Sequence, residues 1–265
     1  MKKFAVIGDP IKHSLSPILH SEIFYQLGID ANYQKFHVPS DSLAVFMSNN
    51  NFDGLNVTIP HKETIIKYLK DLDPSASSIG AVNCIYRNIG FNSDWIGFMK
   101  AMINNGIELK GKSCLIIGAG GVAKSVAHAL IVTQASSIYV KNRSKIRAEK
   151  LMKWIKEKFP ANTNDPLLSY EAIINCTPIG MWPKIENMPS NKTIIQKASI
   201  LIDTIYNPIE TLWLKEGKSY GAKTLGGLDM FIAQGLASAD IWFQENISEK
   251  IDSNKIRKRL ELEIC

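Results

Sequence analysis

A glycine-rich turn between an apolar segment and an amphipathic one constrains this chain more than any other feature. Residues 113–117 (Ser-Cys-Leu-Ile-Ile) have the apolar character of a buried strand, and Gly118, Gly120 and Ala123 follow with the spacing G-x-G-x-x-A. Apolar side chains then repeat at helical spacing. A strand, a tight glycine turn and a helix in this order are typical of the dinucleotide-binding unit of a doubly wound α/β fold.

Each small residue of this motif has a steric reason. Gly118 permits the tight turn, Gly120 lacks the Cβ that would block a pyrophosphate, and Ala123 lets the helix pack close to the strand. The first helical turn offers free N–H groups and a partial positive charge to phosphates. An ordinary structural turn is the alternative, but it requires neither the strand before nor the helix after the glycines.

The segment after the next predicted strand, 137–140, favours one dinucleotide over the other. In an NAD site, an acidic residue about 20 positions beyond the glycines binds the ribose 2′-hydroxyl. Here no carboxylate occurs before Glu149, and the segment reads Lys141-Asn142-Arg143-Ser144-Lys145-Ile146-Arg147. Positive side chains attract a 2′-phosphate, and a guanidinium offers paired donors to its oxygens. The sequence therefore favours NADP; a solvated helix start is the alternative, although basic residues there oppose the helix dipole.

Composition and charge exclude several other classes of protein. A hydrophobic fraction of 45% and a charged fraction of 21% are ordinary for a globular enzyme. No apolar run approaches the roughly 20 residues that cross a bilayer, and the apolar stretch at 4–7 is too short for a secretory signal. We therefore expect a cytoplasmic protein without membrane contact. The net charge of +6 is dispersed over helix faces such as 150–158 rather than gathered in a basic stripe, so we expect no nucleic-acid partner.

The cysteines and histidines predict neither metal nor disulfide chemistry. No two cysteines form a C-x-x-C pair and no histidine pair has zinc-ligand spacing; the cysteines are Cys84, Cys114, Cys176 and Cys265. His20 and His128 fall inside helical patterns and are expected to be structural.

Strand-like and helix-like stretches alternate along the chain, which predicts an α/β protein. Strands are expected at 4–7, 33–38, 54–59, 81–86, 89–92, 113–117, 137–140, 172–175 and 200–205. Helices are expected at 17–27 (with Ser16 as N-cap and Pro17 at its first position), 43–47, 60–69, 95–105, 229–244 and 253–262. We expect an N-terminal α/β substrate domain with a mostly parallel sheet at 1–100, completed by helices at about 236–265. A Rossmann-like doubly wound domain should occupy 101–235, with the active site in the cleft between the two.

Three dense polar clusters accompany the predicted N-terminal strands. They cover residues 8–17, 56–62 and, in two pieces, 81–83 with 92–94. Because ligands of parallel α/β sheets bind beyond the carboxyl ends of strands, we expect all three clusters at one edge. Their hydroxyls and amides suit a small polyhydroxylated acid, and Ser14 and Ser16 could bind its carboxylate. A site built in this way rejects analogues that lack a hydroxyl.

Hydride transfer from an alcohol also requires a group that takes the hydroxyl proton. Without a metal this must be a side chain, and Lys62 and Asp94 are the best candidates. The alternative for each is structural, namely a surface lysine at a helix start and an N-cap aspartate before Trp95. The adjacent His61 is expected to point away from Lys62 if this turn is helical.

Together these motifs resemble the shikimate/quinate dehydrogenase family, and in particular its NADP-dependent shikimate dehydrogenases, over nearly the whole chain. The resemblance rests on segments 14–17 (Ser-Leu-Ser-Pro), 56–62 (Asn-Val-Thr-Ile-Pro-His-Lys), 80–83, 92–94, 118–121, 142–144, 175–181, 206–208 and 226–234. It is not perfect, because Ser93 stands where threonine is common and Ile209-Glu210-Thr211 follows Asn207-Pro208 where the family often has a Thr-Pro step.

The resemblance implies the reduction of 3-dehydroshikimate to shikimate with NADPH, in the chorismate pathway of aromatic amino acid biosynthesis, without a metal. It implies that Lys62 and Asp94 are the catalytic pair. It assigns the substrate to Ser14, Ser16, Asn56, Thr58, Asn83, Asp94, Tyr206 and Gln234. It assigns the cofactor pyrophosphate to Gly118, Ala119, Gly120, Gly121 and Val122, and the 2′-phosphate to Asn142, Arg143, Ser144 and Arg147, with Lys145 adding charge beside it. It places Thr177, Met181, Thr204 and Gly227 near the nicotinamide half.

Two other functions remain open at this point. One is a quinate/shikimate dehydrogenase of relaxed substrate or cofactor use, and the other is a dinucleotide-binding regulator without catalysis. The partner is expected to be a small molecule, and the protein a monomer or a homodimer.

Overall fold

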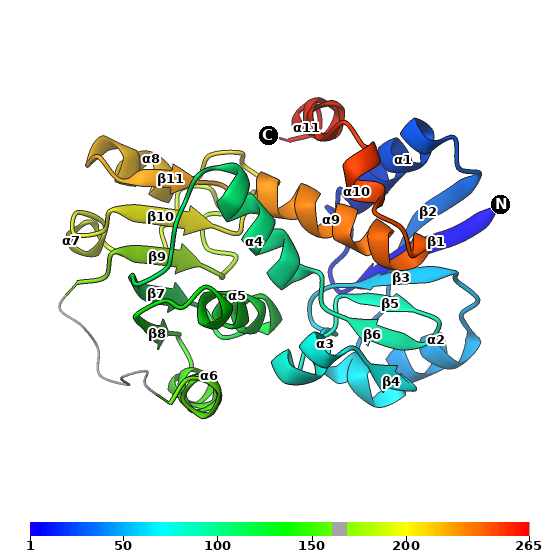
Figure 1. The fold of residues 1–265 in the computed structure, drawn as a ribbon, viewed down its shortest axis with the longest axis horizontal. Helices are drawn as coiled ribbons and strands as arrows, with labels where there is room; N and C mark the ends of the chain where they lie inside the picture. Colours follow the sequence, from blue (N-terminus) through cyan, green and yellow to red (C-terminus); the bar gives the residue numbers. More distant parts are fainter. Residues whose placement is uncertain (161–168, 265) are drawn as a thin grey trace. The chain divides into compact units, whose positions relative to one another are not determined.

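The computed structural model describes residues 1–160 and 169–264, and it divides the chain into two compact units. Unit 1 comprises Met1–Gly97 with Ile232–Glu263, and unit 2 comprises Phe98–Phe231. Figure 1 shows a sheet with covering helices in each unit. The expected α/β class is confirmed. Among the described residues, no helix is both long and apolar enough to cross a membrane.

Unit 1 contains a six-stranded sheet in the order β2-β1-β3-β5-β6-β4. Its first half alternates strands and helices: β1 (Lys2–Gly8), α1 (Ser16–Leu27), β2 (Ala31–His37), α2 (Leu43–Asn49) and β3 (Gly54–Val57). A 3₁₀ helix η1 (Thr64–Tyr68), β4 (Asp71–Leu72), α3 (Pro74–Ile79), β5 (Cys84–Tyr86) and β6 (Ile89–Phe91) follow, before α4 (Asp94–Asn104). From the C-terminal part come α9 (Leu228–Phe243), α10 (Ile247–Lys250) and α11 (Ser253–Glu261).

The direction of the strands brings the polar clusters of unit 1 to one edge of the sheet. β1 lies between β2 and β3 and pairs in parallel with both, so all three strands end at the same edge of the sheet. β5 runs antiparallel to β3 and to β6. Asn83, directly before β5, therefore lies where β3 ends, and Asn92, directly after β6, lies there as well. The sheet is mostly parallel, as expected, and β5 supplies its antiparallel pairs.

The core of unit 1 forms on both faces of β1, because Phe4 to Ile7 are all buried. Phe4 stacks on Trp242 of α9 with the ring centroids 4.7 Å apart. A Cβ on Gly54 would lie 2.5 Å from the Trp242 ring, so glycine is what allows this helix to approach the sheet. The Trp242 indole also donates to the Ile85 carbonyl, so α9 is fixed to the sheet by both packing and hydrogen bonding.

Unit 2 contains a five-stranded sheet in the order β11-β10-β9-β7-β8, and every pair in it is parallel. Its elements are β7 (Ser113–Ile117), α5 (Gly121–Val132), β8 (Ser137–Lys141), α6 (Lys145–Lys158), β9 (Ala172–Asn175), α7 (Lys192–Ile195), β10 (Ile200–Asp203), α8 (Leu212–Ser219) and β11 (Lys223–Leu225). β9 and β10 are buried along their whole length, as expected of central strands covered on both faces. The order is that of a doubly wound sheet, with its switch point between β7 and β9.

Two elements at the edge of the unit 1 sheet differ from the prediction. The helix expected at 60–69 is wrong: turns occupy 60–63, and η1 is a short 3₁₀ helix. The carbonyl of Lys62 accepts from the Val82 N–H at 2.7 Å, so it is not available to an α-helical turn. The strand expected at 81–86 begins only at Cys84, because Val82 and Ala81 use their backbone groups for Lys62 and for the Asn92 amide.

The N-cap assigned to Ser16 is also wrong. α1 begins at Ser16, Leu15 is the N-cap residue and Pro17 follows in the first turn. The Ser14 hydroxyl accepts from the Ser16 N–H, so Ser14 satisfies a donor that an N-cap side chain would otherwise bind. The strands expected at 54–59 and 200–205 are each two residues shorter, ending at Val57 and Asp203.

Within the part of the chain that the structure describes, no group of three or more His, Cys, Asp or Glu side chains is arranged to hold a metal ion. Among the described residues, Cys84, Cys114 and Cys176 form no disulfide. Cys265 lies outside the described residues.

Candidate active site

Lys62 and Asp94 form a buried ion pair in unit 1. Lys62 lies in the turn after β3 and Asp94 is the first residue of α4, and Lys62 Nζ donates to Asp94 Oδ2 at 2.6 Å. The two side chains are only 11% and 6% exposed. The structural alternatives do not apply, because Lys62 does not face solvent and the Asn92 side chain accepts from the backbone N–H groups of Asp94 and Trp95. The expected orientation of His61 depended on a helical turn, which is absent, and His61 Nε2 lies 2.6 Å from the Val38 carbonyl oxygen.

Asn83 connects this pair to the neighbouring polar groups. Its Nδ2 donates to Asp94 Oδ1 at 2.9 Å and lies 3.5 Å from Gln234 Oε1 on α9. Its Oδ1 accepts from the Ser93 N–H at 2.6 Å. Each oxygen of the Asp94 carboxylate therefore has a donor. Such additional hydrogen bonds are what make the burial of an ion pair tolerable.

A fully buried hydroxyl that the sequence analysis missed, Ser238 on α9, joins the Asn56 amide to the Ser93 hydroxyl. Asn56 Nδ2 donates to Ser238 Oγ at 3.0 Å, and Ser93 Oγ lies 3.0 Å from the same atom. Ser238 also donates to the Gln234 carbonyl one helical turn earlier. The available signal was a serine four residues after Gln234, inside an otherwise apolar helix.

Tyr33 and His20 complete the buried network, and neither was predicted to take part in it. The Tyr33 hydroxyl donates to Asn56 Oδ1 at 2.8 Å and lies within hydrogen-bonding reach of Ser16. His20 stacks on Tyr33 with the centroids 4.4 Å apart. Burial raises the pKa of Tyr33 well above its usual value and lowers the pKa of His20 to about 3. Both rings are therefore neutral near pH 7, and the Tyr33 hydroxyl remains a donor.

The remaining predicted substrate residues lie around this network or in unit 2. The Ser14 hydroxyl donates to Ser16 Oγ at 3.1 Å, and Ser14 is the more exposed of the two. Thr58 is half-buried and binds the Ile7 carbonyl through its N–H. Tyr206 belongs to unit 2, where its ring stacks on Phe231.

The glycine-rich turn of unit 2 has the geometry that a pyrophosphate requires. Gly118 adopts a φ of +121°, and a Cβ there would lie 2.8 Å from the carbonyl oxygen of Cys176. A Cβ on Gly120 would meet nothing within 4 Å, so the space beside it is open to a ligand. Gly120 is also the N-cap residue of α5, and no side chain caps this helix. The N–H groups of Gly121 and Val122 at its start are thus directed as anion donors.

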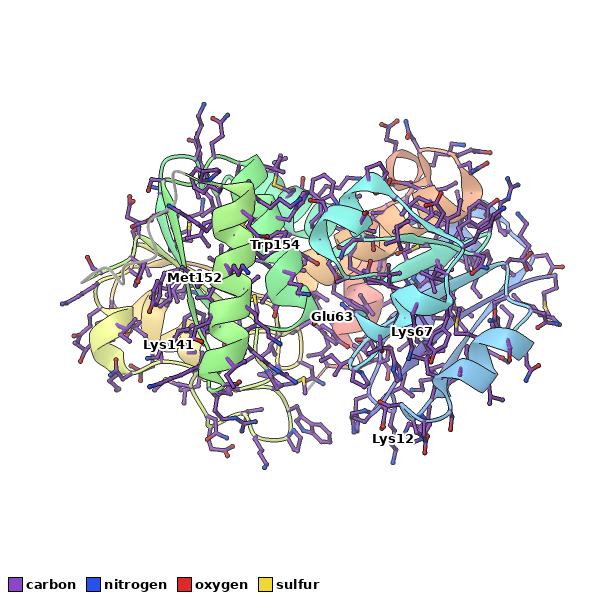
Figure 2. All side chains as sticks on the ribbon, turned by 90° about the horizontal axis from the view of Figure 1, so that it is seen from below. Lys12, Glu63, Lys67, Lys141, Met152 and Trp154 are labelled. Carbon is purple, nitrogen blue, oxygen red and sulfur yellow. The ribbon has the colours of Figure 1, made fainter. Side chains whose placement is uncertain are left out.

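The basic segment follows β8 directly. Figure 2 labels Lys141 at the carboxyl end of that strand. The Ser144 hydroxyl caps α6 by accepting from the Arg147 N–H, and the Asn142 amide donates to the Ser144 carbonyl. The side chains of Arg143, Lys145 and Arg147 are exposed. Asn142 and Ser144 therefore shape the loop, while the cationic groups are accessible to an anion.

Three of the four residues expected near the nicotinamide are connected through the ends of β9 and β10. Thr177 Oγ1 donates to Asn175 Oδ1 at 2.7 Å, and Thr204 Oγ1 donates to the Asn175 carbonyl at 3.0 Å. A Cβ on Gly227 would overlap the Thr204 carbonyl. Met181, the fourth residue, is 45% exposed in the segment that follows β9.

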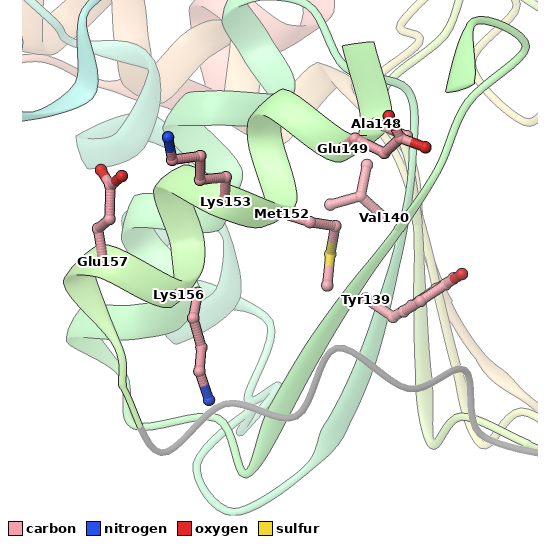
Figure 3. A pocket seen from close by; sticks show the side chains of 8 residues that line it. All are labelled: Tyr139, Val140, Ala148, Glu149, Met152, Lys153, Lys156 and Glu157. Atoms are coloured by element: carbon pink, nitrogen blue, oxygen red, sulfur yellow. The ribbon is translucent and has the colours of Figure 1, made fainter. Parts of the chain in front are cut away.

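A separate hollow of about 530 Å³ lies against α6 and β8. Figure 3 shows its side chains, which include Tyr139 from the strand and Met152, Lys153 and Glu157 from the helix. None of the predicted site residues lines it, so it is not the candidate active site.

Comparison with known proteins identifies the family. Residues 6–85 match the family model of the shikimate dehydrogenase substrate-binding domain, and residues 100–205 match that of shikimate/quinate 5-dehydrogenase. The chain belongs to the shikimate dehydrogenase family. The NADP⁺-dependent shikimate dehydrogenase of Geobacillus kaustophilus is 37% identical over 254 residues, covering 91% of this chain and 92% of the relative. That of Methanococcus maripaludis (strain S2) is 38% identical over 258 residues, covering 91% of each.

Solved structures agree with this assignment. A shikimate dehydrogenase crystallised with NADP⁺ superposes with a TM-score of 0.88 at 36% identity, covering 98% of this chain and 96% of the other. The Thermus thermophilus enzyme in complex with NADP(H) and shikimate gives a TM-score of 0.85 at 31% identity, covering 98% and 100%. The Listeria monocytogenes enzyme, crystallised with shikimate and NAD, gives 0.84 at 29% identity, covering 98% and 96%.

Replacing Gly120 with alanine should separate cofactor binding from folding. The added methyl group has open space and an ordinary φ of −100°, so the free energy of unfolding should change by less than about 1 kcal/mol. The same methyl group would occupy the pyrophosphate position, so the Kd for NADP⁺ should rise at least ~10-fold, or ~1.4 kcal/mol. Urea unfolding and isothermal titration calorimetry measure the two effects. As a contrast, Gly118→Ala should destabilise the fold itself, by about 1–3 kcal/mol. Unchanged NADP⁺ affinity in Gly120→Ala would contradict the assignment of this turn.

Replacing Ser238 with alanine should disturb the substrate side alone. The change removes one of the two acceptors of Asn56 Nδ2, which also donates to the Asn83 carbonyl, and a buried N–H left without a partner costs about 1–3 kcal/mol. We expect a KM for shikimate raised ~5-fold or more and a KM for NADP⁺ within two-fold of wild type, measured by steady-state kinetics. Thr133→Ala, at the C-cap of α5, is the matched control, because the Thr133 hydroxyl also donates to a carbonyl one turn back but lies outside the site. Equal effects of the two changes would remove Ser238 from the substrate network.

Proposed function

We propose that this protein catalyses the reversible NADPH-dependent reduction of 3-dehydroshikimate to shikimate, a step of aromatic amino acid biosynthesis. The observation that carries the proposal is the buried Lys62–Asp94 pair, set among amides and hydroxyls in a chain of the shikimate dehydrogenase family. The names of the full-length relatives support NADP as the cofactor and shikimate as the substrate.

Each unit takes one of the two ligands in this proposal. Unit 1, which includes the match to the substrate-binding domain model, binds shikimate. Unit 2 binds NADP at the switch point of its doubly wound sheet. The expected domain limits at about 100 and 235 are proposed on the same basis.

Lys62 is proposed to handle the proton of the reaction. Bound NADPH supplies the hydride that adds to the carbonyl carbon of 3-dehydroshikimate. The Lys62 ammonium donates its proton to the carbonyl oxygen, which becomes the new hydroxyl, and the resulting amine regains a proton from solvent. In the reverse direction the neutral amine accepts the hydroxyl proton. Asp94 fixes the position of Lys62 Nζ through the 2.6 Å contact and is fixed in turn by Asn83.

Hydroxyls and amides are proposed to hold the substrate. Ser14 and Ser16 bind its carboxylate by hydrogen bonds, and Asn56, Thr58, Asn83, Asp94, Tyr206 and Gln234 bind its hydroxyl groups and carbonyl. In unit 1 the amides of Asn56 and Asn83 are already oriented by buried partners, so little reorganisation is needed when substrate arrives.

Unit 2 is proposed to hold NADP in three parts. The N–H groups of the turn Gly118, Ala119, Gly120, Gly121 and Val122 bind the pyrophosphate. Asn142, Arg143, Ser144, Lys145 and Arg147 bind the adenosine 2′-phosphate. Thr177, Met181, Thr204 and Gly227 surround the nicotinamide half.

The protein is proposed to act in the cytoplasm on these small molecules, as a monomer or a homodimer. A dehydrogenase that also uses quinate or NAD is the second candidate, because the Listeria monocytogenes relative was crystallised with NAD. The exposed cations at Arg143, Lys145 and Arg147 favour NADP over NAD as the cofactor. A regulator without catalysis has no use for a buried lysine–aspartate pair.

One assay tests the activity and the role of Lys62 together. Wild-type protein should reduce NADP⁺ with shikimate at a rate well above that with quinate or buffer, and more efficiently than it reduces NAD⁺, as followed by absorbance of the reduced cofactor. Lys62→Ala should lower kcat at least ~100-fold, as expected for loss of a general acid–base group. Lys67→Ala, a neighbouring exposed lysine labelled in Figure 2, should keep a wild-type rate. An inactive wild type would refute the function, whereas an active Lys62→Ala would refute only the mechanism.

Replacing Arg143 with alanine should discriminate between the cofactors. Loss of a charge-assisted hydrogen bond costs about 1.5–3 kcal/mol, so the KM for NADP⁺ should rise ~10-fold or more. The KM for NAD⁺ should stay nearly constant, because NAD⁺ has no 2′-phosphate. Lys150→Ala, an exposed change further along α6, serves as the control for general charge effects. Equal rises for both cofactors would place Arg143 elsewhere than at the phosphate.

A further inference from the structure

Asp203, at the carboxyl end of β10, is a buried acid for which the proposed reaction has no use. It is 1% exposed. Its Oδ1 accepts from the Asn175 Nδ2 and from the Ile205 N–H, both at 3.0 Å, and its Oδ2 accepts from Thr211 Oγ1 at 2.9 Å. Among the described residues these donors are all neutral. A buried carboxylate held only by dipoles is costly, so its position calls for a reason.

The three donors belong to three different segments of unit 2. Asn175 ends β9, Ile205 follows β10, and Thr211 is the N-cap residue of α8, where its hydroxyl also accepts from the Leu214 N–H. The two oxygens of Asp203 therefore connect these three segments directly by hydrogen bonds.

Asn175 is hydrogen-bonded in turn to Thr177 and Thr204, two of the residues expected near the nicotinamide. Its Nδ2 is held by Asp203, so its Oδ1 is turned toward Thr177, where it accepts from the N–H at 3.0 Å and from the hydroxyl at 2.7 Å. Its carbonyl accepts from both the N–H and the hydroxyl of Thr204. Gly227 packs against the Thr204 carbonyl and donates its N–H to Ile205. The carboxylate thus orients the side-chain amide that binds Thr177, and Thr204 is bonded to the main-chain carbonyl of the same asparagine.

We propose that Asp203 is a positioning residue for the cofactor, whose carboxylate holds the ends of β9 and β10 so that Thr177 and Thr204 are presented to the nicotinamide half of NADP. The inference rests on the proposed function, because that function places these threonines beside the nicotinamide. It extends that function by a residue that does not touch either ligand and acts through Asn175.

The charge of Asp203 provides a signature that a purely structural residue would lack. Burial raises the pKa of this carboxyl to about 7, although all three hydrogen bonds oppose the shift. The groups that face it are neutral on every side: Asn175 from β9, the Ile205 N–H after β10, and Thr211 at the start of α8. The ionised carboxylate accepts all three bonds, whereas the protonated one must donate through one oxygen. The restraint therefore weakens as the pH falls through about 7.

The folding stability should respond to pH in the opposite direction. Because the pKa in the folded state is raised above its unfolded value of 3.8, the stability linked to protonated Asp203 is fully present below about pH 3.8 and is lost as the pH rises through about 7. Cofactor positioning improves over the same interval. The neutral variant Asp203→Asn should abolish both trends, since its side chain does not titrate.

Binding measurements on the full chain test this without turnover. The Kd values of NADP⁺ and of adenosine 2′,5′-bisphosphate, which lacks the nicotinamide half, are compared by calorimetry at pH 6 and pH 8.5. At pH 8.5, Asp203→Asn should bind NADP⁺ ~5-fold or more weakly than wild type and the bisphosphate within two-fold. At pH 6 the two proteins should agree within two-fold for both ligands. The bisphosphate corrects for titration of the 2′-phosphate itself.

Two further variants provide an independent test and a control. Thr211→Val removes the donor to Oδ2 while keeping the carboxylate, and it should weaken NADP⁺ but not the bisphosphate, which keeps the test valid if Asp203→Asn does not fold. Asp240→Asn is the matched control, since Asp240 accepts from Ser248 in unit 1, and it should leave both ligands unchanged. Equal weakening of both ligands in Asp203→Asn, no weakening, or a loss that is the same at both pH values would overturn the proposal. If the wild type does not oxidise shikimate, the proposed function is refuted. The ratio of the two Kd values still tests the role of Asp203, because it does not depend on turnover.

Discussion

The buried contact between Lys62 and Asp94 is the interaction on which the polar edge of unit 1 depends. A charge without its partner in such a position costs about 3–5 kcal/mol, so both must reach the same place in the folded chain. The antiparallel pair of β5 and β6 makes this possible, because β6 returns the chain to the end of β3 and sets the start of α4 beside it. The buried partners around Asn83 and Asn56 then satisfy the polar groups that this arrangement takes out of water.

The two units use the same topological feature to place their candidate residues. In each sheet the first strand is flanked by the second and the third, so the loops after the first and third strands diverge and leave room for a ligand. A glycine ends or follows the first strand in both cases. A Cβ on Gly8 would lie 2.9 Å from the Ile59 carbonyl, and one on Gly118 would lie 2.8 Å from the Cys176 carbonyl. In each unit, the glycine therefore lets the loop after the first strand start close to the loop after the third strand, which a residue with a Cβ would prevent.

The sequence predicts those parts of the fold and of the site that follow from local residue patterns and from the order of strands and helices. Alternation of strands and helices predicts both sheets, and the position of Lys62 and Asp94 just beyond two strands at one expected sheet edge predicts that they lie close together. The helix expected at 60–69 failed because its apolar side chains repeat at helical spacing while the Lys62 carbonyl is taken by Val82, a contact that no local pattern reveals. Ser238 was missed for a related reason, since its partner Asn56 lies 182 residues away in sequence.

Asp94 and Asp203 show how the same side chain serves two purposes in one protein. The charge of Asp94 is balanced by Lys62, so the pair can remain buried, and the proposed reaction uses the lysine of this pair. The charge of Asp203 is balanced by three neutral donors alone, each from a different segment. Dipoles stabilise a buried charge only when they are held in fixed orientation, and the carboxylate is what fixes them. An acid of this kind is suited to ordering the segments around a site rather than to chemistry within it.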